Sequence, residues 1–228
     1  MIMFGGPFAA FSYLILLNVP FTALGLACVV LGATLMLTPS SPVPVHTIRA
    51  MVEGSCVNIE ALLEEFDARW RAVYLPPRDG RVYAYVPLTR NPGALAAWAA
   101  MDAPLRVVTE VEGEPGLLVF PPGSEVVRLS MLSPDAGIEE ALNHVLVDFV
   151  EAAESVKAVR EGGRMVVDIK TSRVETEFPR FRMVLGSLCT SIVGCVLSTV
   201  LGVPLLLQDE QIEGRRIRAV FLEVPRAG

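Results

Sequence analysis

The chain opens with a long apolar segment. No Asp, Glu, Lys or Arg occurs before Arg49, and residues 3–37 are almost entirely apolar. Asn18-Val19-Pro20 interrupts this run with a turn-forming residue and a helix-ending proline. We therefore predict two helices, from Met3 to Leu17 and from Phe21 to Leu37, with lengths of about 22 and 26 Å.

Two apolar helices satisfy their own backbone hydrogen bonds, as any segment in lipid must. Both are short for a hydrocarbon core of about 30 Å. We expect a transmembrane helical hairpin, with the lipid bilayer as the partner of residues 3–37. The alternatives are one long span, a hairpin that does not cross fully, and a cleaved signal peptide. The signal peptide is disfavoured because the segment has no basic residue.

The first basic residues indicate an orientation. Arg49, Arg69 and Arg71 follow the second apolar helix, whereas no Lys or Arg precedes them. The positive-inside rule then places both termini in the cytoplasm. The predicted localisation is the cell membrane, as a multi-pass protein with a cytoplasmic C-terminal domain.

The pattern divides the chain into a transmembrane hairpin (residues 1–38), a proline-rich linker (39–45) and a cytoplasmic domain (46–228). Apolar residues at helical spacing predict helices over residues 48–66, 91–101, 134–161 and 183–201, with Gly162-Gly163 ending the third. β-rich runs bounded by turn residues predict strands at 71–75, 81–88, 105–111, 117–120, 165–171, 204–212 and 215–224. We expect one α+β or α/β domain, large enough for an ordinary core.

A second uncharged run, Val184–Leu207, is also long enough to cross a membrane. A crossing would separate Arg215–Arg218 from the rest of the sheet. A buried helix followed by a β-hairpin therefore fits better than a third span, and both alternatives stay open.

Small residues recur at every fourth position of this run, from Gly186 through Gly194 to Gly202. Such a stripe lets a ligand or a partner helix approach the backbone closely, and it equally suits tight packing on the domain's own sheet. Gly194, at its centre, is a candidate ligand-binding residue.

The chain has 19 basic and 25 acidic side chains, a formal net charge of −6, which argues against broad nucleic-acid binding. Arg180 and Arg182 precede the uncharged run, and Arg216 and Arg218 alternate on a predicted strand, which puts both on one face. A small anion or a lipid headgroup is the expected ligand of these arginines. Solvated charges that prevent strand pairing are the alternative.

The usual catalytic motifs are absent from the sequence: we find no Walker loop, G-x-G-x-x-G, G-x-S-x-G or H-E-x-x-H. His144 lies between Glu140 and Asp148 at helical spacing, which suits a metal or a proton relay but more commonly marks a solvated acidic face. The four cysteines lack metal spacing and are expected to be free thiols. We assign no catalytic residue, metal ligand or cofactor, and a non-catalytic role is favoured without excluding an enzyme.

Several short segments carry a family resemblance. They are Val57–Leu63, Tyr74-Leu75-Pro76-Pro77, Tyr85-Val86-Pro87-Leu88, Gly202-Val203-Pro204 and Gly214-Arg215-Arg216-Ile217. In this arrangement the chain resembles uncharacterised archaeal membrane proteins with an N-terminal transmembrane hairpin and a soluble α/β domain. The resemblance implies a layout and no catalytic residues.

Together these observations predict a membrane-anchored cytoplasmic domain that acts as a non-catalytic binding or scaffolding module. Its partner would be another protein or a second copy of the chain. The alternative is a subunit of a membrane enzyme or transport complex that assembles through the hairpin.

Overall fold

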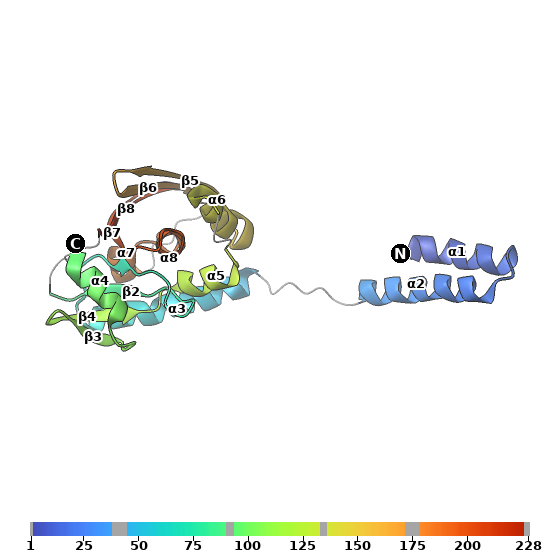
Figure 1. Cartoon of the computed structure of the whole chain (residues 1–228), viewed down its shortest axis with the longest axis horizontal. Helices are drawn as coiled ribbons and strands as arrows, with labels where there is room; N and C mark the ends of the chain where they lie inside the picture. Colours follow the sequence, from blue (N-terminus) through green and yellow to red (C-terminus); the bar gives the residue numbers. More distant parts are fainter. Residues whose placement is uncertain (1, 38–44, 90–93, 133–135, 172–177, 226–228) are drawn as a thin grey trace. The chain divides into compact units, whose positions relative to one another are not determined.

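Figure 1 shows the computed structural model, which describes residues 2–37, 45–89, 94–132, 136–171 and 178–225. The chain divides into two compact units, Met1–Arg49 and Ala50–Gly228, and each is described by itself. The predicted linker lies outside the described residues except for Val45, which begins a helix.

The first unit consists of two helices, α1 (Ile2–Leu14) and α2 (Val19–Leu37), close to the predicted bounds. Asn18 begins α2. Its side-chain Oδ1 accepts a hydrogen bond from the Phe21 N–H at 3.3 Å, and its carbonyl accepts one from the Thr22 N–H at 3.1 Å. This cap satisfies backbone donors at the point where the sequence predicts a turn.

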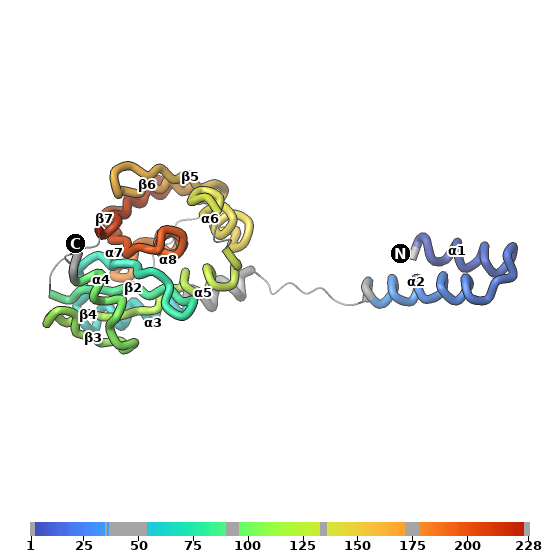
Figure 2. The backbone as a smooth tube through the Cα atoms, in the orientation of Figure 1, coloured from blue at the N-terminus to red at the C-terminus, as the bar shows by residue number. Residues whose placement is uncertain are grey.

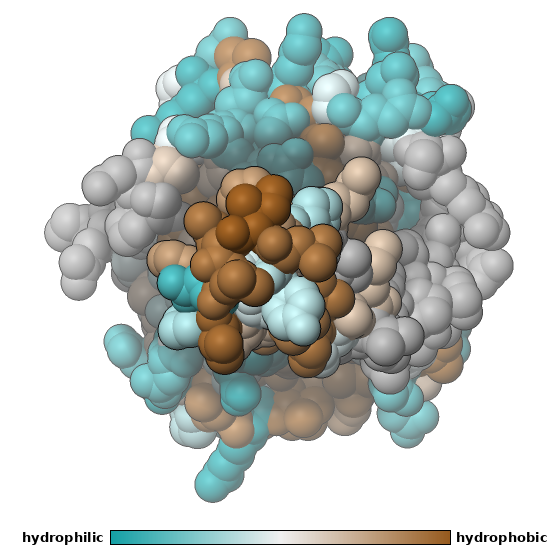
Figure 3. All heavy atoms as spheres, turned by 90° about the vertical axis from the view of Figure 1, so that its right-hand side faces the viewer, coloured by the Kyte–Doolittle hydropathy of each residue, from teal (hydrophilic) through white to brown (hydrophobic). Residues whose placement is uncertain are grey.

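The two helices touch through their smallest residues. A Cβ added at Gly25 would lie 2.7 Å from the Cβ of Ala9, and one added at Gly5 would lie 2.8 Å from the Gly25 carbonyl oxygen. Large apolar side chains point outward instead: Phe4 is 69% exposed and Leu24 is 55% exposed. Figure 3 shows such apolar residues, in brown, on the surface of this unit.

Length does not single out these two helices as membrane spans. Among the described residues, the one segment long and apolar enough to cross a membrane is Pro179–Leu201, and 78% of its most apolar 18-residue window is buried inside the second unit. Val19–Thr34 is apolar but shorter. The two apolar helices are confirmed, whereas the transmembrane hairpin and the multi-pass topology are not.

The second unit is built on one sheet of eight strands in the order β3-β4-β2-β1-β7-β8-β6-β5. The strands are β1 (Val73–Tyr74), β2 (Ala84–Pro87), β3 (Val108–Val111), β4 (Glu114–Val119), β5 (Ala153–Glu161), β6 (Arg164–Thr171), β7 (Leu205–Glu213) and β8 (Arg216–Glu223). All the described strand pairs are antiparallel. An antiparallel sheet with separate helices is an α+β fold, as expected.

The sheet curls around one helix, α8, and two shorter helices close the open side (Figures 1 and 2). The helices of this unit are α3 (Val45–Glu65), α4 (Ala94–Asp102), α5 (Pro122–Leu129), α6 (Ile138–Asn143), α7 (Pro179–Leu185) and α8 (Leu188–Leu201), with a π-helical turn η1 (His144–Phe149) after α6. On the opposite face of β1–β4, α4 packs its alanines and forms a second, smaller core.

Helix α8 lies at the centre of the main core. The ten consecutive residues from Cys189 to Ser198 are all buried. A Cβ added at Gly123 of α5 would lie 2.7 Å from the Ile192 Cα, and one at Gly194 would lie 2.6 Å from the Tyr74 ring. The uncharged run Val184–Leu207 therefore folds as a buried helix and the start of a strand, which is the first of the two alternatives.

Two predicted helices end elsewhere than expected. The helix predicted at 134–161 stops at Phe149, and its last part is the strand β5 instead. Ala153 and Val156 both face the core, and their spacing of three looks helical in the sequence. A register shift between Ala153 and Ser155 puts the two side chains on the same face of a strand instead. The helix predicted at 183–201 is divided at Gly186, whose φ of 82° ends α7.

Helix α5 was not predicted. The segment Phe120-Pro121-Pro122 suggested the end of a strand, and the strand does end at Val119. Pro122, however, is the first residue of α5, a position that proline favours because no N–H is needed there. The helix predicted at 91–101 is present as α4, although residues 90–93 lie outside the described residues.

The packing of α8 gives a test by substitution. Gly194→Ala places a methyl group against the Tyr74 ring, so we expect the free energy of unfolding to fall by about 2 kcal/mol. Gly54→Ala in α3, where nothing lies within 4 Å of an added Cβ, is the control and should be neutral or stabilising by up to about 1 kcal/mol. Fluorescence of Trp70 and Trp98, both in the second unit, follows unfolding in detergent. Equal stability of Gly194→Ala and wild type would contradict this packing.

Candidate functional site

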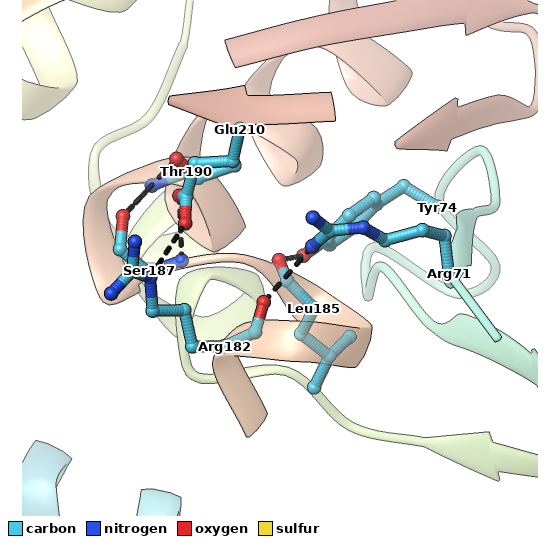
Figure 4. Close-up of polar contacts among 7 residues, drawn as sticks. All are labelled: Arg71, Tyr74, Arg182, Leu185, Ser187, Thr190 and Glu210. Carbon is cyan, nitrogen blue, oxygen red and sulfur yellow. Dashed lines mark hydrogen bonds and ion pairs between the residues drawn. The ribbon is translucent and has the colours of Figure 1, made fainter. Parts of the chain in front are cut away.

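A cluster of polar groups lies where α7 ends and α8 begins (Figure 4). Ser187 caps α8, and its hydroxyl accepts a hydrogen bond from the Thr190 N–H at 3.3 Å. Glu210 reaches this junction from β7. Its Oε1 accepts from the Ser187 N–H at 2.8 Å and its Oε2 from the Arg182 Nε at 3.2 Å. The Glu210 side chain is only 1% exposed, so a helix N-terminus and a guanidinium stabilise a buried carboxylate.

The same junction is tied to β1 from the other side. The Tyr74 hydroxyl donates to the Leu185 carbonyl at 2.6 Å, and Arg71 Nη1 donates to the Arg182 carbonyl at 3.0 Å. The Leu185 carbonyl lies at the end of α7, where carbonyl groups lack a partner within the helix, whereas the Arg182 carbonyl also accepts from the Gly186 N–H at 3.0 Å. Figure 4 shows both side chains pointing to the end of α7.

The start of α7 is held by α3. The Glu60 carboxylate accepts hydrogen bonds from the N–H groups of Arg180, at 2.9 Å, and of Phe181. The Arg180 guanidinium lies 3.4 Å from the Asp67 carboxylate and donates to the Ala68 carbonyl at 3.3 Å. Arg180 and Arg182 are therefore engaged within their own domain, where they fasten α7 to α3 and β7.

Gly194 also meets its own domain. The Tyr74 ring occupies the space beside it, with a distance of 2.6 Å from an added Cβ to the ring carbon Cδ2. The close approach that a small residue permits is thus made by β1. Tight packing on the sheet is the alternative that the contacts of Gly194 support.

Arg216 and Arg218 lie on β8, the strand next to β7, and both are exposed, whereas Ile217 between them is buried. They share one face, as the alternation predicts. In the register, Arg216 stands opposite Lys170, and Arg218 stands opposite Asp168 with 3.4 Å between the charged groups. The structure therefore separates the four candidate arginines into two places.

Two lysines on strands β5 and β6 extend the exposed basic surface of β8. Lys157 of β5 stands opposite Asp168, in the same row as Arg218, and Lys170 stands beside Arg216. We call Lys157, Lys170, Arg216 and Arg218 the sheet-face patch. Neither lysine was a candidate from the sequence, because Lys157 falls within a predicted helix and the pairing of the strands at 165–171 and 215–224 was not predicted.

Acidic residues border the sheet-face patch. Glu154 lies 2.6 Å from the Lys170 amine and also pairs with Arg215, and Glu213 stands opposite Arg216 in β7. Hydrogen bonding from Lys170 is the main cause that lowers the pKa of Glu154, so this carboxylate is ionised at neutral pH. The patch is a mixed surface in which two positive side chains, Lys170 and Arg216, are nevertheless direct neighbours.

The histidine and cysteine candidates form no metal site among the described residues. His144 Nε2 lies 3.1 Å from the Ser130 carbonyl oxygen. Among the described residues, no group of three or more His, Cys, Asp or Glu side chains could hold a metal ion. Cys56, Cys189 and Cys195 are buried free thiols, and Cys28 is half-buried.

Burial perturbs two groups beside the polar cluster. The Tyr74 hydroxyl and the Cys195 thiol are fully enclosed, and this burial raises the pKa of each well above its ordinary value. A thiol with a raised pKa is protonated at neutral pH and is a poor nucleophile. The chemistry of Cys195 is therefore that of a core residue.

Comparison with known proteins identifies one match. A family model described as "Domain of unknown function (DUF7982)" matches residues 15–219 of the chain. No curated protein and no solved structure matches significantly. The matched segment begins ahead of α2 and extends into β8, so it includes parts of both units.

The two raised pKa values predict how stability depends on pH. Unfolding frees Cys195 to ionise above about pH 9 and Tyr74 above about pH 10, their ordinary values, whereas the folded state keeps both protonated. The unfolded state then binds fewer protons, so stability falls as pH rises, by about 1.4 kcal/mol per pH unit for each group. Urea unfolding of wild type and Cys195→Ala should give a shallower fall for the variant. Parallel curves would contradict the assignment to Cys195.

Proposed function

The chain belongs to the family described as "Domain of unknown function (DUF7982)", and we propose that it is a membrane-anchored, non-catalytic binding module. The first unit is the anchor, and the second unit presents the sheet-face patch to anionic groups. The family match supports this proposal because the matched segment, residues 15–219, contains α2 together with most of the second unit.

The observation that carries the proposal is the inverted packing of the first unit. Small residues such as Gly5, Ala9 and Gly25 line the contact between its helices, and large apolar side chains face outward. This is the arrangement of helices packed in lipid, where close backbone contact replaces the hydrophobic effect. In water the same surface would be a continuous apolar patch of the kind that monomeric proteins rarely expose.

The helix lengths suit a shallow or locally thinned bilayer. Helix α1 has 13 residues and α2 has 19, which correspond to about 20 and 28 Å. A hydrocarbon core of about 30 Å adapts to short spans by thinning, at a modest energetic cost. With Arg49 as the first basic residue after α2, the positive-inside rule places the second unit in the cytoplasm.

The sheet-face patch supplies the binding surface of the proposed module. Lys170 and Arg216 stand opposite each other on neighbouring strands, and each also has an acidic neighbour, Glu154 for Lys170 and Glu213 for Arg216. An anion bound between the two positive side chains would accept charge-assisted hydrogen bonds from both. We assign a lipid phosphate as this anion, because the anchor would confine the patch near an anionic membrane surface.

The anchor is tested by fractionation of cells that express the full chain. We expect the wild type to stay with membranes through an alkaline carbonate wash. Leu24→Arg with Leu31→Arg should release the protein, since each arginine in the hydrocarbon core costs about 3 kcal/mol. The control is Val57→Arg with Val159→Arg, equally exposed positions of the second unit, which should stay in the membrane fraction. Wild-type protein in the carbonate supernatant would contradict an anchor.

The patch is tested in nanodiscs that hold the full chain. A dye on Ser155→Cys, an exposed position beside Lys170, should be quenched by labelled headgroups more strongly in anionic than in neutral bilayers. Arg216→Gln with Arg218→Gln should remove this difference, and Arg69→Gln with Arg81→Gln, also exposed, should not. High salt should weaken the effect. Equal quenching in both bilayers would contradict lipid binding, and competition by inorganic phosphate would indicate a shared anion site.

A further inference from the structure

Strand β3 forms one edge of the sheet and is unusually apolar for that position. Its neighbour in the sheet is β4 on one side only. Leu105, Val107 and Val108, in and just before β3, are 49%, 52% and 48% exposed. Soluble proteins normally protect such an edge with charges, prolines or bulges, because it offers unpaired backbone groups to another chain.

The opposite edge of the same sheet has these protections. Strand β5 carries the exposed charges of Glu154, Lys157 and Arg160, and its register shifts between Ala153 and Ser155. A charged, irregular edge resists pairing with a further strand. The contrast makes β3 the edge at which the sheet can extend.

The ladder between β3 and β4 shows which backbone groups face outward. The Leu118 N–H donates to the Val107 carbonyl at 2.9 Å, so the backbone groups of Val107 point toward β4. Backbone groups alternate along an antiparallel strand. The N–H and C=O groups of Val108 and Glu110 therefore point to the free edge, whereas the Arg106 N–H already donates to the Pro104 carbonyl at 2.7 Å.

The side chains of these three residues also share a face. Val108 and Glu110 are exposed while Thr109 and Val111 are buried, and Arg106, two residues before Val108, is also exposed. A shallow depression of about 560 Å³ lies along this edge, and Arg106, Val108 and Glu110 are among its lining residues. Positive, apolar and negative side chains thus follow one another in a line of equal spacing.

We propose that β3 pairs with β3 of a second copy of the chain, antiparallel about a two-fold axis through Val108. In this register Arg106 of each copy stands opposite Glu110 of the other, and the two valines at position 108 face each other. A two-fold interface repeats every contact, so one ion pair becomes two. Pairing about Thr109 instead would set Val108 opposite Glu110 and Arg106 opposite Glu112, so Glu110 would have no ion-pair partner.

The same register covers the apolar side chains on the other face of β3. Leu105 would meet Val111 of the second copy, and Val107 would meet Thr109. These residues continue the smaller core that α4 forms with β1–β4, of which Val111 is already a member. The dimer joins two sheets through β-strand addition, and it follows from the second unit whether or not the first unit enters a membrane.

Charge reversal tests both the dimer and its register. Arg106→Glu or Glu110→Arg alone sets like charges opposite each other at two places, so we expect dimerisation of the full chain in detergent to weaken at least about tenfold. A mixture of the two variants sets Glu against Arg at both places and should restore a one-to-one complex. The double variant Arg106→Glu/Glu110→Arg should dimerise like the wild type. Sedimentation measures all four samples.

Glu65→Arg, on the exposed end of α3, changes the net charge equally and should leave dimerisation unchanged. Tryptophan fluorescence checks that each variant stays folded. A wild type that remains monomeric at every concentration would overturn the proposal. So would a dimer that neither reversal weakens, because association through the first unit or through β5 does not involve Arg106 or Glu110.

Oxidation gives a second test of the register. Residues at position 108 of the two copies would have Cα atoms about 5.5 Å apart, a distance that a disulfide spans. Val108→Cys should therefore form cross-linked dimers on mild oxidation, beyond the background that Cys28 gives in the wild type. Glu65→Cys is the control for random collision. A dimeric Val108→Cys protein that cross-links no faster than Glu65→Cys would exclude the two-fold axis at Val108.

Discussion

The second unit depends on the burial of an uncharged helix inside a single sheet. Helix α8 has no charged side chain and is buried on every side over ten consecutive residues, so it needs apolar contacts all around. One flat sheet covers only one side of a helix. The sheet therefore curls around α8, and α5 and α6 complete the enclosure. Gly123 and Gly194 are glycines because α5 and the Tyr74 ring come too close for a Cβ.

Because α8 is enclosed, the polar groups near its N-terminus are needed as hydrogen-bond partners for its backbone. The N-terminus of a buried helix has N–H groups that water cannot reach, and Ser187 with Glu210 satisfies them. Glu210 in turn needs a cation, which Arg182 supplies at 3.2 Å. Arg180 and Arg182, which are candidate ligand-binding residues in the sequence, therefore stabilise the fold. Arg216 and Arg218 are exposed on the outer face of the sheet and do not hold α7 in place. This division makes the outer face the better place for a ligand.

The periodicity of apolar residues predicts most helices and strands of this protein. It fails where a local irregularity, such as a bulge, gives a strand the spacing of a helix. The alternation of Arg216, Ile217 and Arg218 identifies a strand with one wet face, and the structure agrees. Ala153 and Val156 imitate a helix because a bulge changes the spacing of a strand. The candidate site was harder to predict, since the partners of Arg182 and Gly194 come from strands β7 and β1. Contacts between distant segments leave no periodic signal in a single chain.

The two apolar segments of the chain show why composition alone does not distinguish a membrane helix from a core helix. Pro179–Leu201 is long and apolar, yet 78% of its most apolar 18-residue window is buried inside the second unit. Helices α1 and α2 are shorter, but Gly25 faces Ala9 while Leu24 faces outward. The direction of the large side chains therefore distinguishes the two segments, which composition does not. Large side chains that face outward are what the proposed anchor requires, and those of a core helix face inward.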